Sequence, residues 1–342
     1  MNEIQPIDAH GNLDPSAAIY LMLSMTKRCN MRCPGCYYLQ QDEDFFKNQD
    51  IDLEAAREIV RHYRDAGVKQ AIPNAEGDVL LHDEYASLIR YIGTLGFRFR
   101  PWLVTNGIRL PEVAEFVVRN VGEVLISVDG STHGKYNAHR GGNEALFKKV
   151  MAGIRTVVDA GRTCNPRPEI IINCVMTADR CNDIPDMIRL AEDMGVDTIK
   201  FTNYHVAGEK DQKKPVTAGD PETDIILRQT AGRKDYKVNI LLPSLYGKIP
   251  APYSCKMLAS INVGSNGDFA PCCRMMPESK WGNYFSSPDK HNNDALKTFR
   301  LSVTKATRQD ELPRICQKCS HLSPRRLMFL KNENQWYITS RD

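Results

Sequence analysis

The chain has 342 residues, of which 42% are hydrophobic and 25% charged, and its formal net charge is +3. These values are typical of a globular protein with one large domain and a smaller one. The small net charge, without a basic stripe interleaved with aromatic residues, argues against a nucleic-acid partner. No apolar run is long enough to cross a membrane.

The eleven cysteines indicate the compartment. Their number is odd, and no apolar secretory leader precedes Ala17, so we do not expect a framework of disulfide bonds. Reduced thiols that serve metal chemistry fit this pattern better. We therefore expect a cytoplasmic protein.

Short apolar runs alternate with amphipathic stretches after residues 1–17, which we expect to form an N-terminal extension. The expected strands are Ala18–Met25, Val68–Pro73, Phe99–Val104, Val124–Val128, Glu169–Met176 and Val196–Phe201. The expected helices are Leu53–Ala66, Asp83–Leu95, Pro111–Arg119, Glu144–Ala160 and Ile184–Met194. This alternation predicts an α/β fold in which residues 18–205 form a partial (β/α)6 barrel of the TIM type.

Cys29, Cys33 and Cys36 lie in one short loop behind the first expected strand. Pro34 and Gly35 interrupt helical geometry there, so the three thiols can face one side of a tight turn. Cysteine thiolates are the usual ligands of iron–sulfur clusters, and a four-iron cluster takes four of them. Three local ligands would leave one iron open to a substrate or cofactor, as in catalytic zinc sites. Zinc itself is the alternative, although no partner pair of cysteines lies near this loop.

The spacing C-x3-C-x2-C at this place resembles that of the radical S-adenosylmethionine (SAM) superfamily. The resemblance implies a [4Fe-4S] cluster on the three cysteines, with SAM chelating the open iron. It also implies that the reduced cluster splits SAM to methionine and a 5'-deoxyadenosyl radical, which abstracts a substrate hydrogen. A flavodoxin or ferredoxin would supply the electron. Gly35 stands where the superfamily often has an aromatic residue, and Tyr37 and Tyr38 could pack near the adenine instead.

Four further segments follow the expected strands in the order known from this superfamily. The segment 74–78 (NAEGD) resembles its Gly-rich segment that binds the SAM amino group, and 105–107 (TNG) its T-N-G motif. The segment 127–130 (SVDG) resembles its S-x-D-G motif, with a Y-x-x-x-R-G-like stretch behind it. Each alone could be an ordinary turn, but their order at strand ends favours a cofactor site. The resemblance implies cofactor binding by Glu76, Gly77, Asp78, Asn106, Ser127, Asp129 and Arg140.

A second set of cysteines follows residues 206–250, where the alternation breaks and we expect a linker or extension. The runs Ile261–Val263 and Phe269–Ala270 flank a Gly-Ser-Asn-Gly turn and predict a hairpin. A helix is expected at about Asp294–Thr307. The hairpin and the helix would gather four ligand positions for one further metal centre, for which a zinc ribbon is one interpretation. The candidate ligands are Cys255, Cys272 or Cys273, Cys316 and Cys319.

The run C-x11-G-x4-C, with Trp281-Gly282-Asn283 after it, resembles the auxiliary-cluster region of SPASM and twitch radical SAM enzymes. The resemblance implies that residues 251–342 form a small α+β domain of the twitch type with one auxiliary [4Fe-4S] cluster. Cys272 ends the G-x4-C count and is preferred, but the sequence leaves Cys273 open as well.

The auxiliary cluster bears on the reaction, because a fully ligated cluster could accept an electron from a substrate radical. We expect a two-electron oxidation of a small polar substrate such as a sugar, cyclitol or nucleoside, since the short N-terminal segment leaves no room for a peptide-recognition domain. A peptide-modifying enzyme or epimerase is the alternative, and a non-catalytic zinc- or metal-binding protein is a third possibility. Cys174 would be a hydrogen-atom donor if it faces the barrel, and His205 would be a catalytic base.

Overall fold

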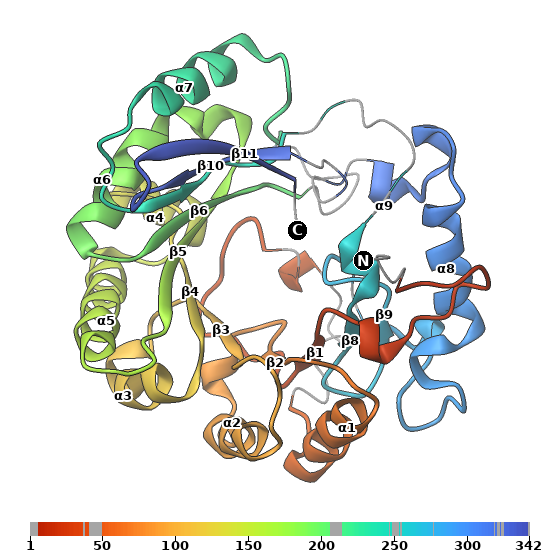
Figure 1. The fold of residues 1–342 in the computed structure, drawn as a ribbon. Helices are drawn as coiled ribbons and strands as arrows, with labels where there is room; N and C mark the ends of the chain where they lie inside the picture. The colour runs from red at the N-terminus through yellow and green to blue at the C-terminus, as the bar shows by residue number, and fades with distance from the viewer. Residues whose placement is uncertain are drawn as a thin grey trace.

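The computed structural model describes residues 6–36, 38–40, 50–205, 214–245, 247, 253, 255–275, 277–317, 319, 322 and 325–340. Its main feature is an open barrel of parallel strands with helices on the outer side (Figure 1). The predicted α/β fold with a partial TIM-type barrel is confirmed. The strands are β1 (Leu21–Ser24), β2 (Ala71–Asn74), β3 (Trp102–Thr105), β4 (Glu123–Ser127), β5 (Glu169–Met176) and β6 (Thr198–Asn203). The outer helices are α1 (Leu53–Asp65), α2 (Tyr85–Thr94), α3 (Leu110–Asn120), α5 (Glu144–Arg162) and α6 (Ile184–Met194).

Local sequence signals fix these helices. The side chain of Asp52 caps α1 by accepting hydrogen bonds from the backbone N–H groups of Glu54 and Ala55. Proline occupies the first turn of α3 and of α6. Gly195 ends α6 in the left-handed conformation, at φ 70°, which a residue with a side chain rarely adopts.

The barrel is built from two sheets that meet between β2 and β3. One has the strand order β2-β1-β8-β9 and the other β11-β10-β7-β6-β5-β4-β3. The backbone N–H of Phe99 donates to the carbonyl of Lys69 at 3.2 Å just before the two strands begin. Figure 1 shows that β2 and β3 lie side by side, so the barrel wall continues across the boundary.

The alternation does not stop at residue 205, contrary to our expectation of a linker or extension over 206–250. Helix α7 (Pro221–Gly232) follows β6, and β7 (Asn239–Leu241) pairs parallel with β6. A further helix, α4 (His133–Arg140), lies between β4 and α5. Both helices carry little apolar periodicity, so the sequence pattern did not reveal them.

The C-terminal segment is joined to both edges of the barrel. The predicted hairpin is present as β8 (Ile261–Val263) and β9 (Phe269–Ala270), and β8 pairs parallel with β1. A second hairpin, β10 (Arg325–Leu330) and β11 (Gln335–Ser340), pairs antiparallel with β7. Helix α8 (Asp294–Thr304) and the short α9 (Arg314–Gln317) lie between them. The segment behind residue 251 therefore shares its sheets with the barrel.

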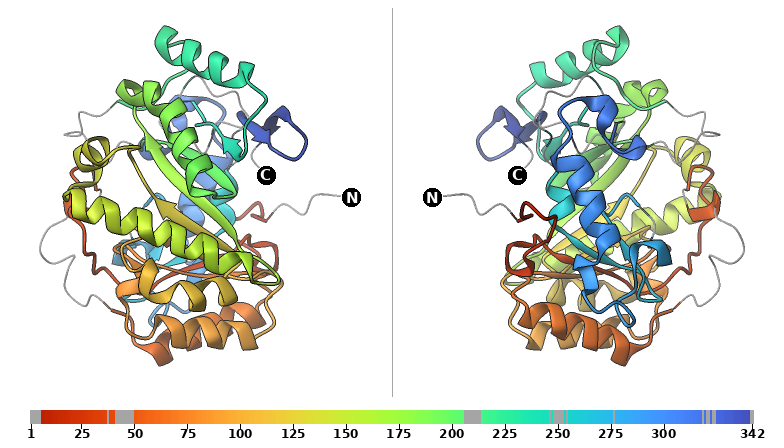
Figure 2. Two further views of the ribbon diagram at one scale, coloured as in Figure 1. Left: turned by 90° about the vertical axis from the view of Figure 1, so that its left-hand side faces the viewer. Right: turned by 90° about the vertical axis from the view of Figure 1, so that its right-hand side faces the viewer.

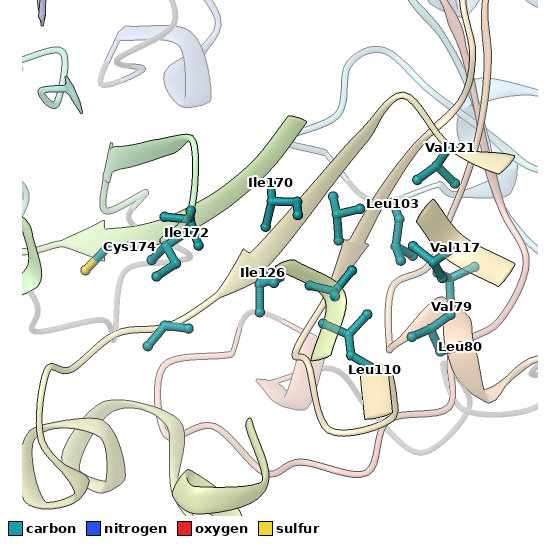
Figure 3. Packing of buried hydrophobic residues seen from close by; sticks show 14 of the residues in the cluster. Val79, Leu80, Leu103, Leu110, Val117, Val121, Ile126, Ile170, Ile172 and Cys174 are labelled. Atoms are coloured by element: carbon teal, nitrogen blue, oxygen red, sulfur yellow. The ribbon is translucent and has the colours of Figure 1, made fainter. Parts of the chain in front are cut away.

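The described residues form two hydrophobic cores. The larger one fills the space between the barrel strands and the outer helices, and Figure 3 shows part of it around Ile126, Ile170 and Leu103. The smaller one includes Phe299 and Val303 of α8, with Cys255 and Cys316 packed against it. Figure 2 shows α5 and α6 on one flank and α8 on the other. No described helix combines the length and apolar character of a membrane span.

The N-terminal extension is attached to the C-terminal segment, although the residues in contact are 278 to 289 positions apart in the sequence. Leu13 is 1% exposed, and its carbonyl accepts hydrogen bonds from His291 and Asn292. Arg300 of α8 donates to the carbonyl of Gly11 at 3.2 Å. These contacts attach the N-terminal extension to the segment that contains α8.

Candidate active site

The three-cysteine loop begins directly behind β1 and forms a tight turn. The backbone N–H of Cys36 donates to the carbonyl of Cys33 at 3.0 Å, across Pro34 and Gly35. The thiols are partly exposed. Burial raises the pKa of the Cys29 thiol, and the charges of Cys33 and Cys36 add to the effect because the three sulfurs are neighbours.

A cavity of about 500 Å³ lies beside this loop at the carboxyl ends of β1 to β4. This is the end of a parallel barrel where active sites are built. Nearly all of the residues predicted for the cofactor meet there. The predicted residues in its wall are Cys29, Cys33, Cys36, Tyr38, Glu76, Gly77, Asp78, Asn106, Ser127 and Arg140. Tyr37 lies outside the described residues. Asp129 does not line this cavity and lies two residues beyond Ser127, which does.

Gly77 is where the segment behind β2 touches the cysteine loop most closely. A Cβ atom at this position would lie 1.8 Å from the carbonyl oxygen of Arg28. The next residue, Asp78, donates its backbone N–H to the same oxygen at 2.8 Å. Only glycine fits this approach, and the contact holds the two cofactor segments together.

Glu76 is buried, with 7% of its surface exposed, and the hydroxyl of Ser24 at the end of β1 donates to its carboxylate. Burial raises the pKa of the Glu76 carboxyl, while the Ser24 hydrogen bond opposes the shift. A carboxyl group in this position can accept hydrogen bonds from a cationic amino group in the cavity.

Asp78 has a positioning role that the sequence motif did not reveal. Its carboxylate accepts hydrogen bonds from the Thr105 hydroxyl at 2.8 Å, the Asn106 backbone N–H at 2.7 Å and the Leu80 backbone N–H at 3.1 Å. Asn106 in turn donates from its amide to the side-chain oxygen of Asn30 in the cysteine loop at 2.8 Å. Asp78 thus links the ends of β2 and β3 and, through Asn106, the loop with the thiols.

We expect the substitution Asp78→Ala to destabilise the fold by about 3 kcal/mol, because it leaves two buried backbone N–H groups without an acceptor. Urea unfolding of the purified protein measures this change. Asp65→Ala is the matched control, since the Asp65 side chain is 60% exposed in a surface ion pair and should change stability by less than about 0.5 kcal/mol. Equal effects of the two substitutions would contradict the positioning role.

Arg140 connects Asp129 with the cysteine loop. Its Nε lies 2.5 Å from Oδ2 of Asp129, and its guanidinium donates a hydrogen bond to the Cys33 thiol. Burial acts to lower the pKa of Arg140, but the charges of Asp129 and Cys33 outweigh it and raise the pKa above its ordinary value. The arginine therefore stays charged beside the thiols.

Sequence reasoning missed Arg180, which is 5% exposed. Its guanidinium donates to the carbonyl of Asp129 at 2.6 Å and to that of Val175 at 2.7 Å. It ties the ends of β4 and β5 together. The one signal for it in the sequence is its position four residues behind the last residue of β5, Met176.

A second cavity of about 310 Å³ is lined by part of the cysteine loop and by residues at the carboxyl ends of β5 and β6. Cys33, Cys36 and Tyr38 belong to the walls of both cavities. Its far wall contains His205 behind β6 and the segment 273–275 of the second cysteine set. The two predicted metal regions thus face each other across one cavity.

Cys174 does not face this cavity, so the condition for its proposed role as a hydrogen-atom donor is not met. Figure 3 shows it beside Ile172 in the hydrophobic core, and it has no exposed surface. Its neighbour Val175 lines the cavity instead, because successive residues of a strand point to opposite faces. Burial raises the pKa of the Cys174 thiol, which suits an inert core cysteine.

The second set of cysteines is gathered around the smaller core. Burial raises the pKa of Cys255 and of Cys316 to about 12 each, and the charge of Cys319 adds to both shifts. Burial, together with the charges of Cys255 and Cys319, raises the pKa of the Cys272 thiol. Cys273 lines the second cavity. Four thiol positions near one another suit an iron–sulfur cluster or a zinc ion.

The described side chains around the thiols are not preassembled as a metal site. Among the described residues, no three His, Cys, Asp or Glu side chains are placed to hold a metal ion. The donor set of the N-terminal loop nevertheless suits a cluster with three protein ligands. All three thiols belong to one turn. The contact between Gly77 and the carbonyl of Arg28 holds that turn in place, and the buried guanidinium of Arg140 lies against it.

Residues 23–175 match the sequence model of the Radical SAM superfamily. Over an alignment of 216 residues the chain is 31% identical to GTP 3',8-cyclase of Marinobacter nauticus. The alignment covers 61% of this chain and 62% of that protein. It is 25% identical to the GTP 3',8-cyclase of Clostridium acetobutylicum over 83% of this chain and 88% of that protein. Pre-heme d1 synthase of Dinoroseobacter shibae is 25% identical to this chain, over an alignment that covers 58% of this chain and 47% of that protein. The chain thus spans less than two thirds of the first and third of these relatives.

Two solved structures share the fold. Streptococcus suis SuiB bound to the precursor peptide SuiA superposes with a TM-score of 0.64 at 16% identity, over 84% of this chain and 67% of SuiB. The protein anSMEcpe with bound AdoMet and a Cp18Cys peptide superposes with a TM-score of 0.62 at 15% identity, over 90% of this chain and 88% of that one.

Proposed function

We propose that this chain is a radical SAM enzyme that abstracts a hydrogen atom from a small polar substrate, because residues 23–175 match the Radical SAM superfamily model. Its cofactors are those of the superfamily, a [4Fe-4S] cluster and SAM. The observation that carries the proposal is the convergence of the cysteine loop, Gly77 and Arg140 on one cavity. A reduced cluster with bound SAM would supply the radical that attacks an unactivated C–H bond.

The residues around the first cavity would divide the binding of the cofactor among them. Cys29, Cys33 and Cys36 would hold the cluster. Glu76, buried and close to the cavity, would accept hydrogen bonds from the amino group of SAM. Arg140 and Ser127 would bind its carboxylate and ribose.

Direct tests of this function are anaerobic iron and sulfide reconstitution and a SAM cleavage assay. We expect about eight irons per chain, four for each cluster, and 5'-deoxyadenosine that forms only when a reductant is present. A flavodoxin or ferredoxin is the reductant we propose for the cell. A colourless protein with stoichiometric zinc and no SAM cleavage would reject the proposal in favour of a non-catalytic metalloprotein.

The second cavity would hold the substrate. Its volume of about 310 Å³ lies at the lower end of the range for small-molecule sites, and it shares Cys33 and Cys36 with the cofactor cavity. The names of two similar proteins, GTP 3',8-cyclases, refer to a nucleotide, which supports a nucleoside-like or sugar-like substrate. A peptide substrate is the second candidate, because SuiB and anSMEcpe share the fold and their structures contain peptides.

We further propose that Cys255, Cys316, Cys319 and one of Cys272 and Cys273 hold an auxiliary [4Fe-4S] cluster that takes up an electron during a two-electron oxidation of the substrate. Cys273 in the cavity wall supports a cluster close to the substrate. His205, in the same wall, would accept the proton that the oxidation releases.

The substitution Cys319→Ala tests the auxiliary site. We expect the iron content to fall to about half and the oxidised product to disappear, while 5'-deoxyadenosine continues to form. Iron analysis and product chromatography measure these changes. Cys181→Ala is the control, because Cys181 is buried behind β5 beside Thr223. Unchanged turnover of Cys319→Ala would refute an electron-acceptor role.

A further inference from the structure

The second cavity has a positive wall. Arg140, Arg180 and Arg274 line it, and the acidic residue in the described part of its lining is Asp129. His139 and His205 add two further nitrogen-containing side chains. A cavity with this balance of charges attracts anions.

Two of the three arginines have carboxylate partners in the protein. Arg140 is ion-paired with Asp129, whose other carboxylate oxygen accepts the backbone N–H of Val175 at 2.7 Å. Arg180 donates to two backbone carbonyls, and its Nε lies 3.5 Å from Asp183. These two side chains hold the barrel mouth in shape and leave Asp129 neutralised.

Arg274 differs from both. It follows Cys273 in the loop behind β9, is partly buried and lines the cavity. In the described part of the chain the electrostatic neighbours of its guanidinium are the Cys273 thiol and Tyr20, and no described carboxylate forms an ion pair with it. A guanidinium has five N–H donors, and one neighbouring thiol can accept from only part of them, so donors remain for a ligand in the cavity. This pattern is typical of a side chain whose partner is a ligand.

We infer that Arg274 binds an anionic oxygen group of the substrate, a phosphate or a carboxylate. The planar guanidinium matches both groups with two parallel hydrogen bonds. The inference rests on the proposed function because it places the substrate in the second cavity. It narrows the substrate from any small polar molecule to an anionic one, with its charged end at the wall formed by residues 273–275.

Calorimetric titration of the anaerobically reconstituted, SAM-loaded protein tests the inference. The probes are GTP and inorganic pyrophosphate for phosphate, malonate for carboxylate, and guanosine as the neutral reference. We expect at least one anionic probe to bind more tightly than guanosine, and Arg274→Gln to weaken that binding by at least about tenfold. Arg274→Lys, which keeps the charge but loses the two parallel bonds, should fall between them.

Lys280→Gln is the matched control. It removes the same charge from the same segment, but Lys280 is paired with Glu278 at 2.7 Å and lies outside the cavity lining. Its anion binding should stay within about twofold of the wild type. Iron content and the visible spectrum, measured on each variant, report whether Arg274 instead balances the charge of the neighbouring thiolates.

Each outcome decides the inference. The inference is overturned if the wild type binds no anion, or if the wild type and Arg274→Gln bind anions equally. It is also overturned if Arg274→Lys loses iron but keeps its anion binding. SAM cleavage by the wild type is scored separately. If 5'-deoxyadenosine forms but no anion binds, the inference fails alone; if anions bind through Arg274 but SAM is never cleaved, the proposed function fails alone.

Discussion

Replacing Cys33 by alanine is expected to reduce 5'-deoxyadenosine formation below detection and to lower the iron content from about eight to about four atoms per chain. Cys33 lies at the centre of the loop, in the walls of both cavities and in contact with Arg140. Its removal would take away one of the proposed cluster ligands and would also leave Arg140 without its sulfur partner. Iron analysis and chromatography of the SAM cleavage products measure the two effects.

Cys164→Ala controls for the loss of a thiol. Cys164 is partly buried behind α5, where its thiol donates to the carbonyl of Ala160 at 3.6 Å, far from the cysteine loop. We expect full iron content and unchanged SAM cleavage. A Cys33→Ala protein that keeps all its iron and still cleaves SAM would rule out Cys33 as a ligand.

Gly77→Ala should have the second largest effect. The added Cβ would lie 1.8 Å from the carbonyl oxygen and 2.4 Å from the carbonyl carbon of Arg28. Since these are backbone atoms, the two loops must move apart, and overpacking of this kind costs about 3 kcal/mol. We expect lower stability in urea and SAM binding that is weaker by about tenfold or more, because the cysteine loop shifts against the wall of the cofactor cavity.

Gly93→Ala separates this steric effect from the general effect of replacing glycine. Gly93 lies in α2, and a Cβ there would meet nothing within 4 Å. In a helix this substitution stabilises by about 0.5–1 kcal/mol. If Gly77→Ala were as stabilising as Gly93→Ala and left the SAM affinity unchanged, the close approach of Gly77 to Arg28 would have no role.

Much of the barrel could be predicted because its signals are local. The ranges of β5 and α6 agree with the structure to the residue, since β-branched runs and a Pro-to-Gly helix frame are read from neighbouring positions. Helix α4 could not be predicted, because Tyr136 is its one buried residue and its sequence is otherwise polar. Strand β7 has three residues and gains its place from pairing with β6 and β10.

The candidate site divides in the same way. Motif spacing predicted which residues line the first cavity, because each motif lies at the end of a strand and parallel strands end on one side of a barrel. It could not predict that Asp78 positions Asn106, that Arg180 joins β4 to β5, or that Cys174 faces the core. Those facts depend on contacts between elements and on the face of a strand, which a shift of one residue reverses.

By itself, the sequence predicted a set of thiols suited to a cluster, the alternation of strands and helices up to β6 and the order of the segments at the strand ends, because side-chain type and short-range periodicity suffice for these predictions. The tertiary structure decided how the C-terminal segment extends the sheets of the open barrel, through β8 on β1 and β10 on β7. It also decided that Arg274 faces the cavity opposite Cys33. Leu21 pairs with Ile261 and Phe329 with Ile240, so these arrangements depend on contacts between segments far apart in the sequence, whose loop-closure entropy only the complete fold offsets.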